Sequence, residues 1–375
     1  MSAGNKTEFP RKILWHNVLF MTILPVVCAI TTPLYIYNNG FQWQMWVFFA
    51  ICFVVNNMSI TSGYHRYFSH RSYEVHPAIE WLYIFFASGT FQGSLLQWCT
   101  DHRRHHRGVD TDDDPYNIHR GFLYAHLTWM FHDDPTPQEY PKDLTRNKWI
   151  MLQFKYYVWI ASFVGFVLPG IATWAIGLGF WNGVVVCGAL RILLTQHTTF
   201  LINSLAHTLG KRTYTDKHTA RDSIICALLT FGEGYHNYHH SFQADYRNGI
   251  RWYHWDPTKW WIAGLARTGL ARRLKKVQKE EILKARLTME ERMLIAKGAS
   301  AERTRQLKAR IEEAQKRLKT LRESYRSKKA EFAARGSEWR QMMRSEIRSA
   351  KHEFRLARNE WRRFRRSMMR SSAVA

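Results

Sequence analysis

The stretch GEGYHNYHH at residues 232–240 places three histidines within five residues. The stretch HRRHH at residues 102–106 repeats the same His-x-x-His-His spacing far upstream, and a looser pair, His65 and His70, precedes both. Imidazole is a ligand that suits iron, zinc and copper, so clusters of histidine are typical of a metal site. A single cluster can be a surface patch. Two clusters with identical spacing, each beside a long apolar segment, favour a metal-binding protein.

The composition of the chain changes at about residue 270. Aromatic residues make up 15% of the 375 residues, which is typical of a membrane protein with aromatic side chains at its interfaces. Residues 271–375 contain 32 Lys or Arg and 13 Asp or Glu, whereas residues 1–270 carry a net charge of only +5. We therefore predict one domain at 1–270 and a basic helical extension at 271–375. The five cysteines form no CxxC pair, which argues against a thiolate zinc site.

Four apolar segments are long enough to cross a bilayer, which takes about 20 helical residues. A further apolar segment, residues 79–98, is interrupted by Gly89, Gln92 and Gly93, and we predict a buried or interfacial helix there. If this segment were a fifth span, the first two histidine groups would lie on opposite faces of the membrane. The four predicted spans are residues 13–37, 41–61, 150–174 and 178–202.

Basic residues orient these spans. The links at 38–40 and 170–183 contain no Lys or Arg, whereas the N-terminus, residues 62–148 and the chain after residue 207 are rich in both. By the positive-inside rule, both termini and every histidine group lie on the cytosolic side. We therefore predict an all-α integral membrane protein with four transmembrane helices and a cytosolic helical cap that holds the histidines.

The spacing within each histidine group decides which side chains can share a metal. His65 and His70 would lie about 140° apart on a continuous α-helix, so one metal could hold both only if the helix ended between them. Otherwise the two serve different metals. His102 precedes His105 and His106 by three and four residues, so these side chains share a helix face and can bind one metal or two neighbouring metals. The alternative for this second group is a solvated basic loop, because arginines lie between the histidines.

Polar residues near the histidines are candidates for supporting roles. The carboxylates of Asp101 and of residues 110–114 could accept the second N–H of a metal-bound imidazole, or could simply form a helix-terminating turn. Asn203 lies one turn before His207 and could hold a metal-bound water. Arg191 lies inside the fourth span, where a charge is costly, so we expect it to have polar partners there.

The motif Glu233-x-x-His236 resembles part of the carboxylate-rich metal site of soluble helical bundles. Such a site needs two of these motifs and two further glutamates on four helices. The chain does not contain this set, so we predict a metal site made of histidines.

The basic extension has the pattern of a helical hairpin or a self-associating coil. Its apolar residues recur at alternating spacings of four and three, and Gly298 and Gly336 punctuate the segment. We expect two or three long helices that associate with each other, with another copy, or with anionic lipid head groups. Nucleic-acid binding has no motif to support it. The apolar positions are Leu307, Ile311, Ala314, Leu318, Leu321 and Tyr325.

Four motifs together resemble the membrane fatty-acid desaturases, specifically the acyl-CoA delta-9 (stearoyl-CoA type) branch, over roughly residues 10–270. They are HRYFSH at 65–70, HRRHH with the following GVDTDDDPYN up to residue 117, NSLAH at 203–207 and GEGYHNYHH at 232–240. The resemblance implies two non-haem irons, with Asn203 holding a water. The implied ligands are nine histidines: His65, His70, His102, His105, His106, His207, His236, His239 and His240.

The resemblance also implies a reaction. Dioxygen and two electrons would be used to insert a cis double bond, at delta-9, into a saturated long-chain acyl group carried by coenzyme A or by another carrier. Trp98, Thr199 and Phe200 lie where the family lines its substrate tunnel, and Phe200 stands where a tryptophan is common. Arg120 is the implied contact for the acyl head group. Because the chain contains no His-Pro-Gly-Gly haem motif, the expected electron donor is a separate ferredoxin, cytochrome b5 or reductase.

Two other functions fit the histidine groups. A membrane fatty-acyl or alkane hydroxylase uses similar histidine motifs, but the NSLAH motif and the DTDDDPY run favour a desaturase. A non-catalytic protein that binds or transports metal would need polar residues along its spans, which contain few.

Overall fold

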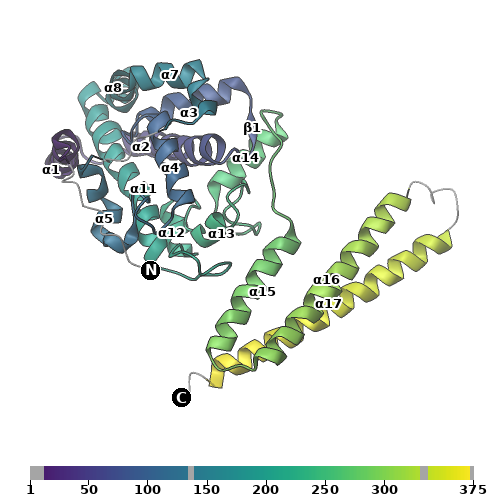
Figure 1. Ribbon diagram of the computed structural model, residues 1–375. Coiled ribbons are helices and arrows are strands. Elements are labelled where there is room, and N and C mark those ends of the chain that lie inside the picture. Colours follow the sequence, from purple (N-terminus) through teal and green to yellow (C-terminus); the bar gives the residue numbers. More distant parts are fainter. Residues whose placement is uncertain (1–11, 134–138, 330–336, 372–375) are drawn as a thin grey trace. The chain divides into compact units, whose positions relative to one another are not determined.

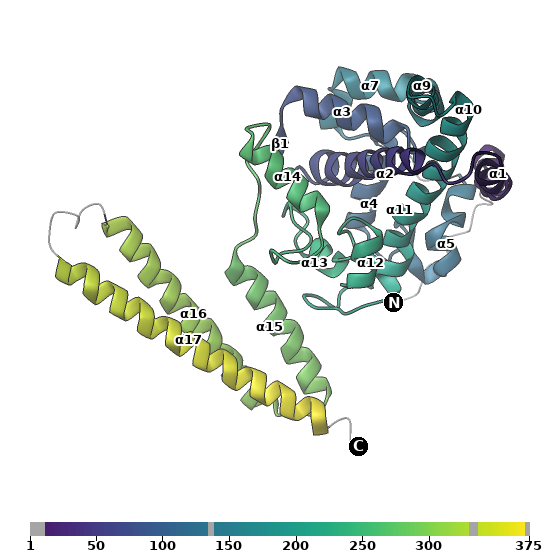
Figure 2. The ribbon, with the colours of Figure 1, turned by 180° about the vertical axis from the view of Figure 1, so that it is seen from behind.

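A computed structural model describes residues 12–133, 139–329 and 337–371 of the chain. The chain forms two compact units, one of residues 1–212 and 217–276 and the other of residues 213–216 and 277–375. Figures 1 and 2 show the helices of both units.

The first unit contains four helices that are long and apolar enough to cross a membrane, which confirms the predicted number of spans. The second and fourth are longer than predicted, with 27 and 29 residues, because each continues past its apolar part and carries a histidine group at its end. The third begins later than predicted, since the chain breaks at Tyr156 after the separate helix α7 (Lys148–Lys155). The spans are α1 (Trp15–Asn39), α2 with η1 (Trp43–Met58, Ser59–Ser69), α8 with η4 and α9 (Tyr157–Ser162, Phe163–Val167, Leu168–Ala175), and α10 with η5 and α11 (Phe180–Gly183, Val184–Leu190, Arg191–Thr208).

Arg191 is buried inside the fourth span and has the polar partners expected of it. Its guanidinium donates to the backbone oxygens of Cys187 (2.7 Å), Gly89 (3.0 Å) and Gly165 (2.8 Å), and also to the side-chain oxygen of Asn56. These partners come from the second and third spans and from the turn after α3 (Pro77–Ser88), so one side chain ties several elements together.

The apolar segment 79–98 is not a single helix, which corrects the sequence-based expectation. α3 has 12 residues, too few to cross a bilayer, and it ends at Gly89. α3 buries Tyr83 and Ile84 while Trp81 remains exposed, as expected for a partly buried helix. A turn follows, and the last residues of the segment begin α4 (Leu95–Arg107), whose N-terminus is capped by the hydroxyl of Ser94.

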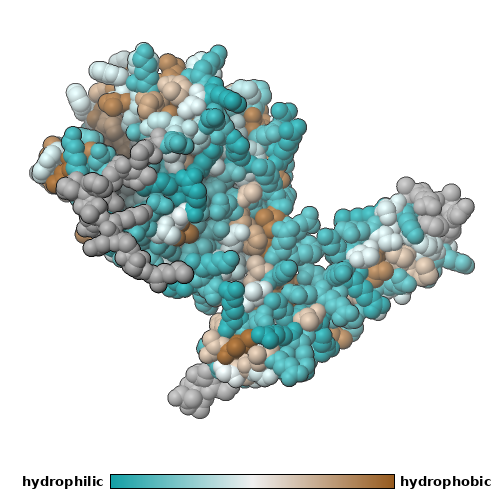
Figure 3. All heavy atoms as spheres, viewed as in Figure 1, coloured by the Kyte–Doolittle hydropathy of each residue, from teal (hydrophilic) through white to brown (hydrophobic). Residues whose placement is uncertain are grey.

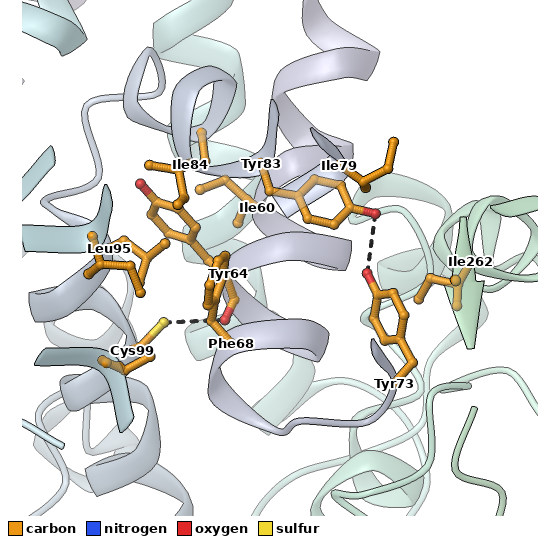
Figure 4. Close-up of a cluster of buried hydrophobic side chains, with 14 of the residues drawn as sticks. Ile60, Tyr64, Phe68, Tyr73, Ile79, Tyr83, Ile84, Leu95, Cys99 and Ile262 are labelled. Atoms are coloured by element: carbon orange, nitrogen blue, oxygen red, sulfur yellow. Dashed lines mark hydrogen bonds between the residues drawn. The ribbon is translucent and has the colours of Figure 1, made fainter. Parts of the chain in front are cut away.

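Figure 4 shows the largest cluster of buried apolar side chains, which lies between η1, α3, α4 and α14 (Pro257–Arg267). Tyr64 of η1 packs here, and its backbone oxygen lies 3.4 Å from the sulfur of Cys99 on α4. Tyr73 donates a hydrogen bond to Tyr83 at 3.2 Å. This core therefore holds together the two helices that carry the first two histidine groups.

Short elements complete the first unit. They include one two-stranded antiparallel sheet, in which β1 (Glu74–Val75) pairs with β2 (Ala271–Arg272). The remaining elements are η2 (Ile118–Arg120), α5 (Phe122–His126), η3 (Thr128–Phe131), α6 (Lys142–Thr145), α12 (Ile224–Leu229) and α13 (His236–Ser241).

The second unit consists of three long helices, α15 (Lys279–Ala296), α16 (Ala301–Lys328) and α17 (Ser337–Ser371). α16 and α17 lie side by side in both ribbon views, and the surface of this unit in Figure 3 is mostly hydrophilic. Gly298 ends α15 with a positive φ of 85°, whereas Gly336 lies outside the described residues. Of the predicted apolar positions, Leu321 and Tyr325 are half-buried, and Leu307, Ile311, Ala314 and Leu318 are buried.

Candidate metal centre

The first histidine pair lies on a π-helix, which the sequence did not indicate. η1 is wound with hydrogen bonds between residues five apart, and its last one joins the N–H of His70 to the backbone oxygen of His65 at 3.1 Å. The wider turn places residues five apart on one face, so the two imidazole centres lie only 4.8 Å apart. The sequence predicted that His65 and His70 could bind one metal only if the helix ended between them, and the helix does end at Ser69. The π-turn is nevertheless what brings the two rings together.

The second histidine group lies on α4 and is largely buried, so the alternative of a solvated basic loop is wrong. His102 and His106, four residues apart, point to the same place as His65 and His70. His105 points elsewhere, and its Nδ1 lies 2.8 Å from the carboxylate of Asp114.

The third group lies on α13, and the glycines before this helix allow the chain to turn sharply. Gly232 has a φ of 99°, and a Cβ atom on Gly234 would lie 2.1 Å from the backbone nitrogen of Ala227. Glycine is therefore required here for the close approach of two backbone segments. α13 then directs His239 to one place and its neighbours, His236 and His240, to another.

The nine predicted histidines gather into two clusters. Within each cluster the candidate ligand nitrogens all lie within 4.8 Å of one another. The five-histidine cluster consists of His65, His70, His102, His106 and His239, and the four-histidine cluster consists of His105, His207, His236 and His240.

The chemistry of both clusters fits bound metal ions. Burial and the neighbouring imidazoles lower the pKa of His70, His102 and His106 in the first cluster and of His236 and His240 in the second, so these rings are neutral at pH 7. Pairs of Nε2 atoms face each other at 2.9 Å (His65 and His239; His70 and His102) and 3.0 Å (His236 and His240). The buried Nε2 of His207 has no hydrogen-bond partner. A cation at the centre of each cluster would satisfy these nitrogens, and an all-imidazole set suits iron, zinc or copper.

Carboxylates orient some of these rings, as the sequence suggested for part of the 110–114 run. Asp114 accepts a hydrogen bond from His105. Asp110 instead reaches the ring of His207 through the side chain of Thr219. Its carboxylate binds the hydroxyl of Thr219 at 2.7 Å, and that hydroxyl lies 2.7 Å from Nδ1 of His207. Partners of this kind fix the tautomer and orientation of a ligating imidazole. Asp112 is exposed. For this residue the structure agrees with the other prediction made for residues 110–114, that their carboxylates simply form a helix-terminating turn.

Glu233 supports the first cluster, a role that sequence reasoning missed. Its carboxylate lies 3.0 Å from Nδ1 of His65 and also forms a buried ion pair with Arg66 at 2.9 Å. Arg66 in turn contacts Asp256 at 3.0 Å. Burial alone would raise the pKa of Glu233, but His65 and Arg66 reverse this and lower it to about 2. A glutamate inside a histidine motif was the only sequence signal that could have pointed to this role.

His218 and Asn203 lie near the four-histidine cluster. The ring of His218 is 5.0 Å from that of His240, and both of its nitrogens are buried without a hydrogen-bond partner. Burial lowers the pKa of His218 to about 4, so its ring is neutral. Asn203 lines the same cavity as His236. The sequence-based reasoning did not select His218, because a lone histidine in a loop carries no pattern.

A cavity of about 870 Å³ adjoins both clusters. Its wall includes His65 and His102 from the first cluster and His105 and His236 from the second. Aromatic and aliphatic side chains form much of the remaining wall, including Phe20, Ile60 and Phe91.

The three predicted tunnel residues all line this cavity. The ring of Trp98 stacks on that of His102 with their centres 5.0 Å apart, and the hydroxyl of Thr199 accepts a hydrogen bond from Gln92 at 3.0 Å. Phe200 is buried. Arg120 does not line the cavity. Its guanidinium is exposed and lies 5.3 Å from the ring centre of Tyr124, a residue that does.

The fold and the site define a class of protein, a multi-span membrane protein with two largely buried histidine clusters beside one cavity. The sequence model of the family described as fatty acid desaturase matches residues 41–275. The chain therefore belongs to the fatty acid desaturase family, which confirms the resemblance found in its motifs.

Curated proteins in the same family are similar over most of this chain. A probable acyl-CoA desaturase of Schizosaccharomyces pombe is 36% identical over 290 residues, which are 76% of this chain and 59% of that protein. Acyl-CoA desaturase 1 of Saccharomyces cerevisiae is 36% identical over 292 residues, covering 76% and 56%. Stearoyl-CoA desaturase of Homo sapiens is 34% identical over 277 residues, covering 72% and 76%. The match thus spans less than two thirds of the length of either yeast protein.

Proposed function

We propose that this protein is an acyl-CoA desaturase that inserts a cis double bond, at delta-9, into a saturated long-chain acyl group. The observation that carries the proposal is the contact of both histidine clusters with one cavity, whose wall also contains many aromatic and aliphatic side chains. The printed names of the relatives, acyl-CoA and stearoyl-CoA desaturases, support the same substrate class.

In this proposal each histidine cluster holds one non-haem iron, and Asn203 holds a water beside the four-histidine cluster. The two irons would supply, with dioxygen and two electrons from an external donor, the oxidising power to remove hydrogen from an unactivated methylene pair, which side chains lack. Ferredoxin, cytochrome b5 and a reductase are the candidate donors.

The protein's own residues bind and shape the acyl chain. Trp98 is held against His102, and Thr199 is tied to Gln92, so these side chains form a wall of defined shape next to the metals. Phe200 is buried, which supports its role in the same wall, and its ring helps to exclude water from the acyl chain of the substrate. Because Tyr124 lines the cavity and Arg120 lies over its ring, we propose Arg120 as the contact for the acyl head group.

We propose that the histidine clusters and both termini face the cytosol. The distribution of Lys and Arg around the four spans supports this orientation.

We also propose that residues 1–270 form the catalytic domain and that the basic extension at 271–375 self-associates or binds anionic lipid. A protein truncated at residue 275 should then retain its iron, measured by elemental analysis after purification, and loss of iron would contradict this division.

Expression of the full chain in a desaturase-deficient cell tests the function. We expect new monounsaturated fatty acids, identified with their double-bond position by gas chromatography and mass spectrometry. The variant His240→Ala should produce none, whereas His352→Ala, which changes an exposed histidine of α17, should behave like the native protein. Hydroxy fatty acids would indicate the alternative hydroxylase. The absence of any new product, despite bound iron and a competent donor, would contradict both enzymes.

A further inference from the structure

The short helix α12 presents an apolar face that no described residue of the first unit covers. Its six residues expose four aliphatic side chains, Ile224 (67%), Ile225 (60%), Leu228 (54%) and Leu229 (46%). The two residues between these pairs, Cys226 and Ala227, are fully buried. Soluble proteins rarely expose such a contiguous patch, so the patch indicates an apolar partner.

The contacts of α12 place it at the depth of the hydrocarbon layer. The sulfur of Cys226 lies 4.0 Å from the backbone oxygen of Leu201. Leu201 follows the start of the fourth span by 21 residues, or about 31 Å of helix, and so lies near the edge of the hydrocarbon layer on the histidine side. Just after the helix, the ring of Phe231 packs on that of Phe53 with centres 5.7 Å apart. Phe53 follows the start of the second span by ten residues, or about 15 Å of helix, which is about half of a typical hydrocarbon thickness.

The backbone of this segment has hydrogen-bond partners at both ends, as a segment in lipid requires. At the start, the hydroxyl of Ser223 accepts from the backbone N–H of Cys226, and the N–H of Ser223 donates to the oxygen of Gly234 at 2.8 Å. At the end, the N–H of Thr230 donates to the oxygen of Cys226 at 2.9 Å, and that of Gly232 to the oxygen of Ala227.

We propose that α12 is embedded in the bilayer without crossing it, with its aliphatic face against the acyl chains of the leaflet on the histidine side. The buried side of α12 packs on the fourth span through Cys226, and Phe231 packs on the second span, so the aliphatic face is directed away from the bundle. This inference rests on the membrane spans and is independent of the proposed reaction.

Fluorescence quenching tests the embedding on the full-length protein. An environment-sensitive fluorophore is attached to the variant Ile225→Cys in phosphatidylcholine vesicles whose acyl chains are either unmodified or brominated. The matched control is Lys217→Cys, an exposed position seven residues before α12. Native cysteines compete little, because four of the five are buried. Unsubstituted protein treated in the same way supplies the background signal.

We expect brominated lipid to quench the label at position 225 several-fold more strongly than the label at 217, and aqueous iodide to do the opposite. Strong quenching of position 225 by iodide would show that α12 faces water and would overturn the proposal. Weak quenching of position 225 by both agents would show that protein, such as a second copy of this chain, covers the face, and would overturn it equally.

Discussion

The two histidine clusters are built from the same motifs but divide them in opposite ways. In HRRHH the first and last histidines, His102 and His106, join the five-histidine cluster, and His105 joins the other. In the third motif the first and last, His236 and His240, join the four-histidine cluster, and only His239 joins the first. Residues four apart share a helix face, whereas the residue before the last lies about 100° away. One His-x-x-His-His motif therefore contributes to both clusters, and the two copies of the motif do so in opposite proportions.

The clusters also differ in how their rings are held. A buried network of Glu233, Arg66 and Asp256 supports His65 directly in the first cluster. In the second, Asp114 supports His105, and Thr219 relays Asp110 to His207. The first cluster thus depends on a buried ion pair, and the second on hydrogen bonds around a loop.

The largest expected effect separates the clusters by their metals. His102→Ala should remove the metal of the five-histidine cluster, and His240→Ala should remove that of the four-histidine cluster. Each substitution removes one of the imidazole ligands on which metal binding at that cluster depends. Each variant should bind about one iron instead of two, by elemental analysis, and lose detectable desaturation in the proposed reaction. Retention of both metals in either variant would contradict the division. Loss of both metals would show that the clusters bind cooperatively.

The next effect compares the two carboxylates that hold a ring. Glu233→Gln removes one partner of buried Arg66, so we expect a loss of roughly 3 kcal/mol in stability together with weaker metal binding at the first cluster. Asp114→Asn should lower metal affinity at the second cluster by about 10- to 100-fold with a smaller loss of stability. Thermal unfolding in detergent and metal titration measure the two quantities. Equal destabilisation by both variants would remove the proposed difference between the clusters.

A smaller effect is expected from the relay to His207. Thr219→Val keeps the shape of the side chain and removes the hydroxyl that joins His207 to Asp110. Affinity for metal at the four-histidine cluster should fall by about tenfold, the low end for such partners, with the five-histidine cluster unchanged. Thr219→Ser, which keeps the hydroxyl, is the matched control and should bind metal like the native protein.

The smallest expected effect is a loss of stability at an ion pair on the helix that contributes to both clusters. Arg103, which forms this ion pair, lies between His102 and His105. Arg103 binds Asp143 through two hydrogen bonds of 2.8 and 2.9 Å. Burial alone would raise the pKa of Asp143, but Arg103 and Arg71 lower it to about 2.

A carboxyl group whose pKa is lower in the folded protein stabilises it above its ordinary pKa near 4, and this stabilisation disappears as the pH falls toward 2. Asp143→Asn should therefore cost about 1 kcal/mol at pH 7, since Arg71 is largely exposed and solvent screens its contribution. The difference from the native protein should shrink as the pH falls from about 4 and should vanish below about pH 2, measured by thermal unfolding at a series of pH values. A difference that persists at low pH would assign the effect to packing.

The sequence was sufficient to predict the four spans, which follow from local patterns of apolar side chains, and the nine histidines that gather, which were implied by the resemblance of its motifs to a known family. It did not predict the π-helix of η1, since nothing in HRYFSH distinguishes a turn of five residues from one of four. The division between clusters was equally hidden, because His239 meets His65 across 174 residues of sequence.

The supporting residues were partly predictable. The acidic run beside the second motif pointed to Asp114, which is nine residues from His105. Thr219 carries no signal, since its role depends on a loop that brings it against His207 and Asp110 at once. Glu233 was considered for a carboxylate-rich site and set aside, and its actual partner, His65, lies 168 residues earlier.

The partners of Arg191 have a consequence for how the protein enters the membrane. The backbone oxygens of Gly89 and Gly165 and the side chain of Asn56 reach this guanidinium only after the earlier parts of the chain are in place. A fourth span that entered the lipid alone would carry an unpaired charge. Packing against spans that are already in place lowers the cost of inserting this helix, which favours its insertion as the last step in forming the bundle.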